Sequence, residues 1–171
     1  MKALLPLLLL LSAATIAHAQ SDGFLGIKWG STPERVIAVM MEVEGVVPGE
    51  RTDSTIDFSG GTYMGVSGPK YGFTFSGGRL VSTVVALEIP DPDAGDVAYS
   101  RIVRGLSKQY GLMEPSPYLI ERAGRAEHTV RTKRTSVSAS MYQIGSERNI
   151  AVVCVGTMPS ERSPRTKSRA R

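Results

Sequence analysis

Two segments of the chain show the apolar spacing of a helix. In the first segment, the apolar positions that recur every three or four residues are Val36, Val39, Met40 and Val43. Ser31 suits the N-cap of this helix, and Glu34 three residues later completes a capping box. In the second segment, the same spacing joins Ala98, Ile102, Leu106 and Tyr110. Gly111 follows as a C-terminal cap, so the second helix is predicted to end there.

The remaining apolar residues alternate or run over short lengths, which indicates strands. The clearest pair is 71–75 with 80–89, joined by Gly77-Gly78 in a two-residue hairpin turn. One face of the second strand is almost wholly apolar, and we expect that face to lie on the core: Val81, Thr83, Val85, Leu87 and Ile89. Further strands are predicted at 24–30, 54–59, 127–135, 136–144 and 149–156.

The predicted order is therefore helix, about three strands, helix, about three strands. This order favours an α+β domain of two αβββ halves, with both helices packed on one face of an antiparallel sheet. The halves share their order of elements and little residue identity, so a duplication of the gene segment does not follow from the sequence.

The first nineteen residues match a cleavable signal peptide. Lys2 provides the positive start, residues 3–11 are apolar, and Ala17-His18-Ala19 fits the cleavage site. The apolar run is shorter than the roughly 20 residues that a membrane-spanning helix needs. The one cysteine is Cys154, so none is present at the cleavage point to carry a lipid. We expect an exported chain, periplasmic or secreted, that begins near Gln20 and has no transmembrane segment after cleavage.

Basic residues gather at the C-terminal end. The whole chain carries a formal net charge of +4. Residues 159–171 alone reach the same value, with Glu161 opposed by Arg162, Arg165, Lys167, Arg169 and Arg171. This segment is rich in Ser, Pro and Arg and poor in apolar residues, which predicts a disordered basic tail. Residues 20–158 are predicted to form a single domain of nearly neutral charge, so no nucleic-acid partner is expected.

The mature chain lacks the residue sets of common catalytic and metal sites. His128 and Cys154 are its one histidine and one cysteine, too few for a zinc site, and no Gly-x-Ser-x-Gly motif is present. His128 lies in a polar segment and is expected to be a solvated imidazole. Cys154 lies in an apolar strand and is expected to be a buried thiol. No catalytic residue, metal or cofactor is predicted.

Carboxylates leave one catalytic alternative open. Asp91, Asp93 and Asp96 do not follow the spacing of a calcium loop, and Asp93 as N-cap with Asp96 at N3 of the second helix accounts for them. A hydrolase that uses paired acids among Asp53, Asp57 and Glu88 remains an alternative, because paired carboxylates catalyse without histidine.

Six residues are candidates for contact with a partner: Trp29, Arg122, Arg125, Arg131, Lys133 and Arg134. Arg131 and Lys133 are predicted to share one face of a strand. The cations suit an acidic envelope protein or an anionic surface such as phospholipid headgroups. Alternatively, they form a charged strand that discourages edge-to-edge aggregation. Trp29 is either a stacking platform or, beside its tight turn, an anchor of a helix on the sheet.

Three motifs resemble those of small exported bacterial domains. Residues 26–36, GIKWGSTPERV, are similar to the turn that leads into the first helix of such domains. Residues 71–87 fit their F-x-F-x-x-G-x-L hairpin, and residues 106–111 fit their L-x-x-x-Y-G helix end. The chain thus resembles the BamE-like and β-lactamase-inhibitor-protein-like folds, although it lacks the lipid-anchor cysteine of the outer-membrane-assembly proteins.

The resemblance implies a non-catalytic function, either binding a protein partner or supporting the cell envelope. The function predicted from the sequence is therefore that of a soluble exported interaction or envelope-support module. The alternatives are the carboxylate hydrolase and a protein that binds an anionic surface or membrane through the basic tail.

Overall fold

The computed structural model describes residues 22–116 and 125–157. Its helices are α1 (Pro33–Met40) and α2 (Pro92–Tyr110). Its short strands are β1 (Gly23–Phe24), β2 (Ile27–Lys28), β5 (Thr62–Tyr63), β6 (Val66–Ser67) and β9 (Glu114–Pro115). Its longer strands are β3 (Val46–Arg51), β4 (Thr55–Gly60), β7 (Lys70–Ser76), β8 (Arg79–Ile89), β10 (Ala126–Arg131), β11 (Thr135–Ile144) and β12 (Glu147–Gly156).

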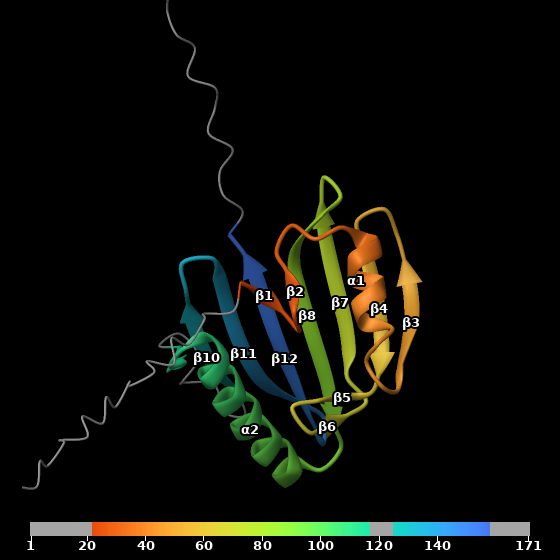
Figure 1. The fold of residues 1–171 in the computed structure, drawn as a ribbon. Helices are drawn as coiled ribbons and strands as arrows, with labels where there is room; N and C mark the ends of the chain where they lie inside the picture. The colour runs from red at the N-terminus through yellow and green to blue at the C-terminus, as the bar shows by residue number, and fades with distance from the viewer. Residues whose placement is uncertain (1–21, 117–124, 158–171) are drawn as a thin grey trace, which may run out of the picture.

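One large antiparallel sheet organises these elements (Figure 1). Eight strands follow one another across it in the order β3-β4-β7-β8-β12-β11-β10-β9. The two central strands, β8 and β12, come from distant parts of the sequence and pair through eight register positions. The predicted antiparallel sheet is therefore confirmed. The pairs β1-β2 and β5-β6 are separate two-stranded ribbons.

The predicted α+β class, with two αβββ halves, is wrong because strands dominate the molecule. Among the described residues, 52% are in strands and 21% are in helices. The sequence interpretation missed β3 and β9, which extend the sheet at its two edges. Pro48 lies within β3. Proline has no N–H to donate to a neighbouring strand, so it is tolerated in an edge strand, where one side of the backbone has no strand to pair with. β3 is an edge strand.

Both helices begin at residues other than those that the capping motifs predicted: α1 begins one residue later and α2 begins two residues earlier. Thr32, rather than Ser31, caps α1, and its hydroxyl accepts a hydrogen bond from the Arg35 N–H. Asp91, rather than Asp93, caps α2, and its carboxylate accepts hydrogen bonds from the N–H groups of Asp93 and Ala94. In both helices a proline occupies the first turn and fixes the preceding residue in extended backbone, which is the N-cap conformation.

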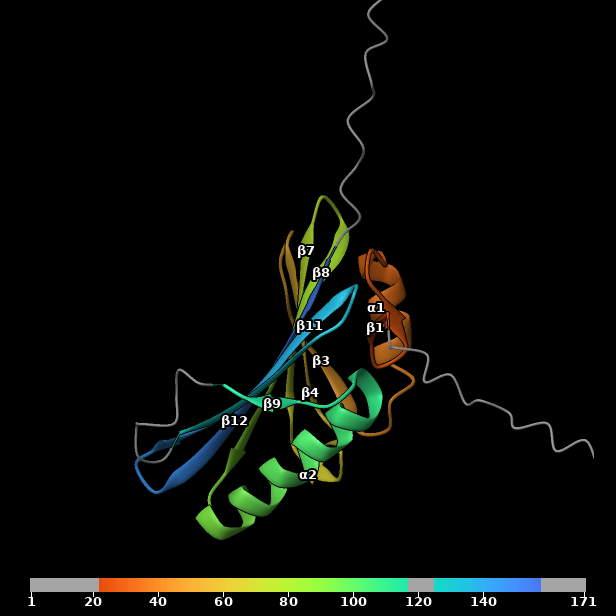
Figure 2. The ribbon, with the colours of Figure 1, turned by 90° about the vertical axis from the view of Figure 1, so that its left-hand side faces the viewer.

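Both helices stand on the same side of the sheet, as the two perpendicular views show (Figures 1 and 2). On that side α2 packs against the strands around β12, α1 lies in front of β4 and β7, and the β1-β2 ribbon lies beside α1 in front of β8 and β12. The core lies between these layers. Buried side chains of the central strands and α2 that form it include Val85, Leu87, Val137, Ile150, Val152, Ile102 and Leu106. Neither described helix is long and apolar enough to cross a membrane.

An aromatic cluster joins the β1-β2 ribbon to the sheet. The ring of Phe73 on β7 lies edge-on to Phe58 on β4 and to Phe24 on β1, with centroid separations of 5.8 and 6.4 Å. The ring of Phe24 also meets Tyr63 at 6.0 Å. The single strand predicted over 24–30 is thus replaced by two short strands, β1 and β2. Phe24, on β1, is a core side chain.

Cys154 is the buried thiol that the sequence predicted. It lies on the core side of β12, its exposed fraction is 0%, and burial raises its pKa to about 12. Since the thiolate is the reactive form, native Cys154 should not react with Ellman's reagent at pH 8, and urea should expose one reactive thiol per chain. The absorbance of the released thiolate measures this. Rapid reaction of the native protein would contradict the burial.

Candidate functional site

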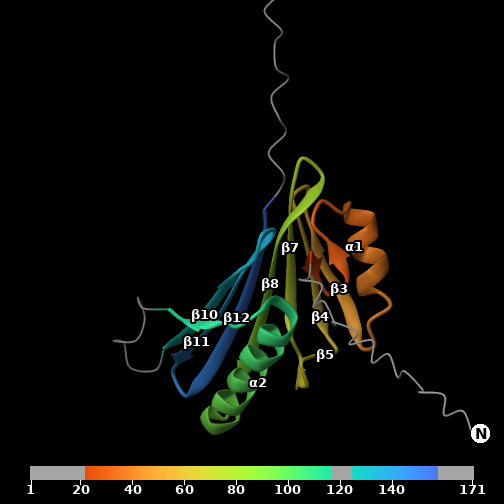
Figure 3. The same ribbon diagram turned by 60° about the vertical axis from the view of Figure 1, so that its left-hand side comes forward.

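The second side of the sheet carries no helix within residues 22–116 and 125–157 (Figures 2 and 3). Because side chains alternate along each strand, this side is lined by the residues between the core positions. Two neighbouring rows of register-matched side chains run through its middle. The first row contains Asp57, Gly72, Val84, Val153, Ser138 and Thr129. The second row contains Ser59, Lys70, Ala86, Ala151, Ser140 and Glu127. We call these twelve residues the open face.

The open face has an apolar centre of small side chains and a charged rim. Val84 and Ala86 on β8 lie beside Val153 and Ala151 on β12, and all four are partly exposed. Asp57 and Lys70 lie toward one edge of the sheet, and Glu127 lies toward the other. Both signs of charge are therefore present, and both lie away from the centre.

One hollow in the open face lies over Gly72. Its volume is about 310 Å³, and the residues around it include Gly49, Asp57, Ser59, Lys70, Gly72, Val84 and Ala86. The Lys70 ammonium donates to the Glu88 carboxylate at 2.8 Å, and this bond raises the Lys70 pKa. The Asp57 carboxylate makes no hydrogen bond or ion pair with another described residue. We call this cavity the Gly72 hollow.

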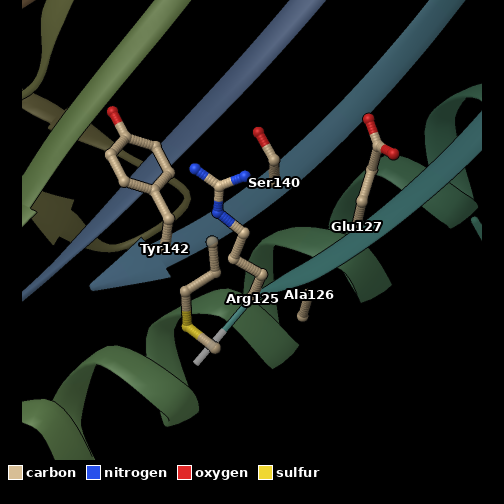
Figure 4. Close-up of a pocket in the computed structure, with 6 residues that line it drawn as sticks. Arg125, Ala126, Glu127, Ser140 and Tyr142 are labelled. Carbon is tan, nitrogen blue, oxygen red and sulfur yellow. The ribbon is translucent and has the colours of Figure 1, made fainter. Parts of the chain in front are cut away.

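A second hollow lies where β10 and β11 pair, with a volume of about 230 Å³ (Figure 4). Figure 4 shows the guanidinium end of Arg125 between the side chains of Tyr142 and Ser140. Ser140 also donates a 3.4 Å hydrogen bond to the Ala151 carbonyl. A guanidinium beside the Tyr142 hydroxyl suits a carboxylate or phosphate group, because both can donate hydrogen bonds to it, whereas the single proton of the Ser140 hydroxyl is already directed to the Ala151 carbonyl. Arg125 is the predicted partner contact whose surroundings match that role.

The structure separates the other predicted cations. Arg131 is the last residue of β10 and pairs with Ser136, whereas Lys133 lies beyond the strand in the turn to β11, so the two do not share a strand face as predicted. Arg134 forms an ion pair with Asp22. Arg122 lies outside the described residues. The Thr132 hydroxyl accepts hydrogen bonds from the Arg134 and Thr135 N–H groups. The turn that these bonds stabilise ends β10 at Arg131, before the predicted end at residue 135.

Trp29 packs against the sheet near the ends of β11 and β12. Its indole N–H donates to the Thr135 hydroxyl at 2.8 Å, and its ring covers Gly156 so closely that an added Cβ there would lie 2.4 Å from the ring. These contacts favour the anchor interpretation of Trp29 over a stacking platform.

Replacement of Gly156 by valine should displace this indole. We expect Gly156→Val to lower the free energy of unfolding by about 1–3 kcal/mol, because overpacking forces neighbouring groups to shift. Trp29 is the one tryptophan, so its emission spectrum measures the displacement. Gly72→Val is the matched control, because the nearest atom to an added Cβ there is 3.5 Å away. Unchanged emission in Gly156→Val would contradict the packing.

His128 is not the solvated imidazole that was predicted. It lies opposite Ala139 on the core side of β10 and is partly buried. The Tyr99 hydroxyl of α2 lies 2.9 Å from His128 Nδ1 and donates to the Ala139 carbonyl at 2.9 Å. The Tyr99 hydroxyl has a single proton and donates it to the Ala139 carbonyl, so it accepts in its contact with His128. Nδ1 of His128 therefore carries a hydrogen. His128 thus connects the sheet to α2.

The three candidate acids do not converge. Asp57 lines the Gly72 hollow, Glu88 is paired with Lys70, and Asp53 lies in the exposed turn between β3 and β4. The Gly72 hollow therefore holds one carboxylate. In the described part of the chain, no three His, Cys, Asp or Glu side chains are grouped as a metal site would require.

Neither the comparison with models of protein families nor the searches among curated proteins and solved structures found a match. The sequence interpretation missed the open face, although a signal was present. Val84, Ala86, Ala151 and Val153 are apolar at positions that alternate with the core residues, where a solvated face normally carries polar side chains.

Proposed function

We propose that this chain is an exported protein-interaction module that docks a partner protein on the open face. The observation that carries the proposal is the apolar centre of a sheet face over which no described helix lies: Val84, Ala86, Ala151 and Val153. An apolar centre with a polar rim is the usual anatomy of a protein interface. Export rests on the signal-peptide pattern of residues 1–19, which lie outside the described residues.

The dimensions of the open face fit this use. From β4 to β10 the sheet has five strand spacings of about 4.8 Å, so the face is about 24 Å wide. A standard protein interface covers about 800 Å² on each partner, a patch of similar width. The two rows of the open face lie about 7 Å apart along the strands, so the open face forms the centre of such an interface and the neighbouring rows complete it. Small side chains at the centre let a partner's longer side chains approach the backbone.

The charges of the face favour a protein over an anionic surface. A membrane or polyanion is attracted by a patch of one sign, whereas the open face carries Asp57 and Glu127 as well as Lys70. Arg131 lies in the row beside the open face. Mixed charges around an apolar centre give orientation and specificity to a protein complex.

Affinity capture from an envelope extract tests the proposal. The mature chain, with and without residues 159–171, should retain the same partner. Val153→Asp places a charge at the centre of the open face and should abolish retention. The matched control is Ser100→Asp, which adds the same charge to the exposed surface of α2 and should retain the partner. Equal retention by Val153→Asp, or no specific protein with either length of chain, would refute the proposal.

A further inference from the structure

Gly72 is a glycine that the fold does not require. Among the described glycines, the others either adopt a positive φ or lie so close to a neighbour that an added Cβ would come within 3.4 Å of it. Gly72 has neither constraint: its φ is not positive, and an added Cβ would meet the Asp57 carboxylate at 3.5 Å, an ordinary contact. A glycine within a strand lowers stability relative to residues with side chains, so its presence here calls for another explanation.

The missing side chain creates the Gly72 hollow. Gly72 pairs with Asp57 on one side and with Val84 on the other, so the floor of the hollow is backbone flanked by a carboxylate and an apolar side chain. Its volume of about 310 Å³ is at the lower end of the roughly 300–1,000 Å³ of small-ligand pockets, which is room for one large side chain. A glycine in a sheet is commonly covered by an aromatic ring, which protects its exposed backbone.

The polar groups of the hollow select among large side chains. The Asp57 carboxylate has no described partner, whereas Lys70 is held by Glu88. An incoming group that donates a hydrogen bond is therefore favoured at Asp57. The nearby Lys70 ammonium repels a second cation and accommodates a hydroxyl, which can accept as well as donate.

We propose that the Gly72 hollow receives one tyrosine side chain of the partner protein, with its ring over Gly72 and its hydroxyl donating to Asp57. The inference rests on the proposed function, because it names the anchor by which the partner engages the open face. Tyrosine is among the residues that most often carry the binding energy of an interface, and such residues occupy pockets of this kind.

The direct test uses N-acetyl-L-tyrosinamide as the probe and amide chemical shifts of the mature chain as the measurement. The probe should shift the amide signals of Gly72 and its neighbours Tyr71 and Val84. N-acetyl-L-leucinamide and N-acetyl-L-argininamide are the competing probes and should bind at least about tenfold more weakly, a difference of about 1.4 kcal/mol. Stronger binding of the arginine probe, or no shift at Gly72 with the tyrosine probe, would overturn the inference.

Two variants separate the hollow from the fold. Gly72→Val fills the hollow and should raise the dissociation constant of the tyrosine probe at least about tenfold. Its urea midpoint should equal or exceed that of the wild type, because valine favours strands. Asp57→Ala removes the acceptor and should reduce tyrosine binding to the level of N-acetyl-L-phenylalaninamide. A tyrosine probe that binds Gly72→Val as it binds the wild type would overturn the inference.

The outcome for the hollow is distinct from the outcome for the proposed function. If a partner is captured through the open face and Gly72→Val still binds it, the tyrosine inference fails and the proposed function stands. If the probe results hold and no partner depends on Val153, the proposed function fails, and the tyrosine anchor of that partner fails with it.

Discussion

Val152→Asp is expected to prevent folding, whereas Val153→Asp leaves the domain folded. The two residues are neighbours on β12, and strand alternation directs them to opposite sides of the sheet. Val152 has an exposed fraction of 0% and lies between Val85 and Ala139 in the core. A carboxylate there has no partner, and its burial should cost more than about 4 kcal/mol. At Val153 the carboxylate reaches solvent, and the cost should be about 1 kcal/mol, set by β-propensity.

Circular dichroism and urea unfolding measure the difference. Val152→Thr is a milder control, because threonine has nearly the same shape as valine. Its hydroxyl loses its hydrogen bonds to water when it is buried in the core, but it carries no charge. A folded Val152→Asp variant would contradict the burial of Val152 in the core. An unfolded Val153→Asp variant would contradict the exposure of Val153 on the open face.

Phe73→Ala is expected to lower the free energy of unfolding by about 3–5 kcal/mol. Its ring contacts Phe24 and Phe58, so removal leaves a cavity that loosens the β1-β2 ribbon as well as the sheet. Since a domain of this size is stable by about 5–15 kcal/mol in total, the variant should be close to its unfolding limit.

The urea dependence of the circular dichroism signal measures this loss. Phe73→Leu retains most of the apolar volume and should lose much less stability. Gly72→Val, one residue away on the opposite side of β7, should lose none. A loss below about 1 kcal/mol in Phe73→Ala would contradict the position of Phe73 in the core.

Local patterns in the sequence predicted the long elements well. The helical spacing over Ala98–Tyr110 and the Gly77-Gly78 turn between two apolar runs correspond to α2 and to the β7-β8 hairpin. The edge strands were missed because Pro48 and Pro115 are normally strand breakers, and only the finished sheet shows that their positions are at its edges. These two strands hold 6 and 2 residues, so they do not by themselves explain the wrong class. The class was wrong because the alternating order of helices and strands was interpreted as a balanced α+β pattern, although the strands that the sequence did predict already contain more residues than the two helices.

The site was less predictable than the fold. Clustered cations suggested one basic surface, yet an early turn at Thr132 places Arg131, Lys133 and Arg134 in different surroundings. The hollow at Gly72 depends on Asp57 and Val84, which are distant in sequence and become neighbours only through strand pairing. Register is a tertiary property, so no local pattern reveals such a cavity.

Photo-cross-linking from defined positions tests the docking surface most directly. A benzophenone side chain is introduced at Ser136, which is exposed on the same side of the sheet as the open face, or at Ser100 on the exposed surface of α2. Irradiation of each protein in envelope extract should give a discrete adduct from Ser136 and none from Ser100. An adduct from Ser100 alone, or no adduct from Ser136, would contradict docking on the open face.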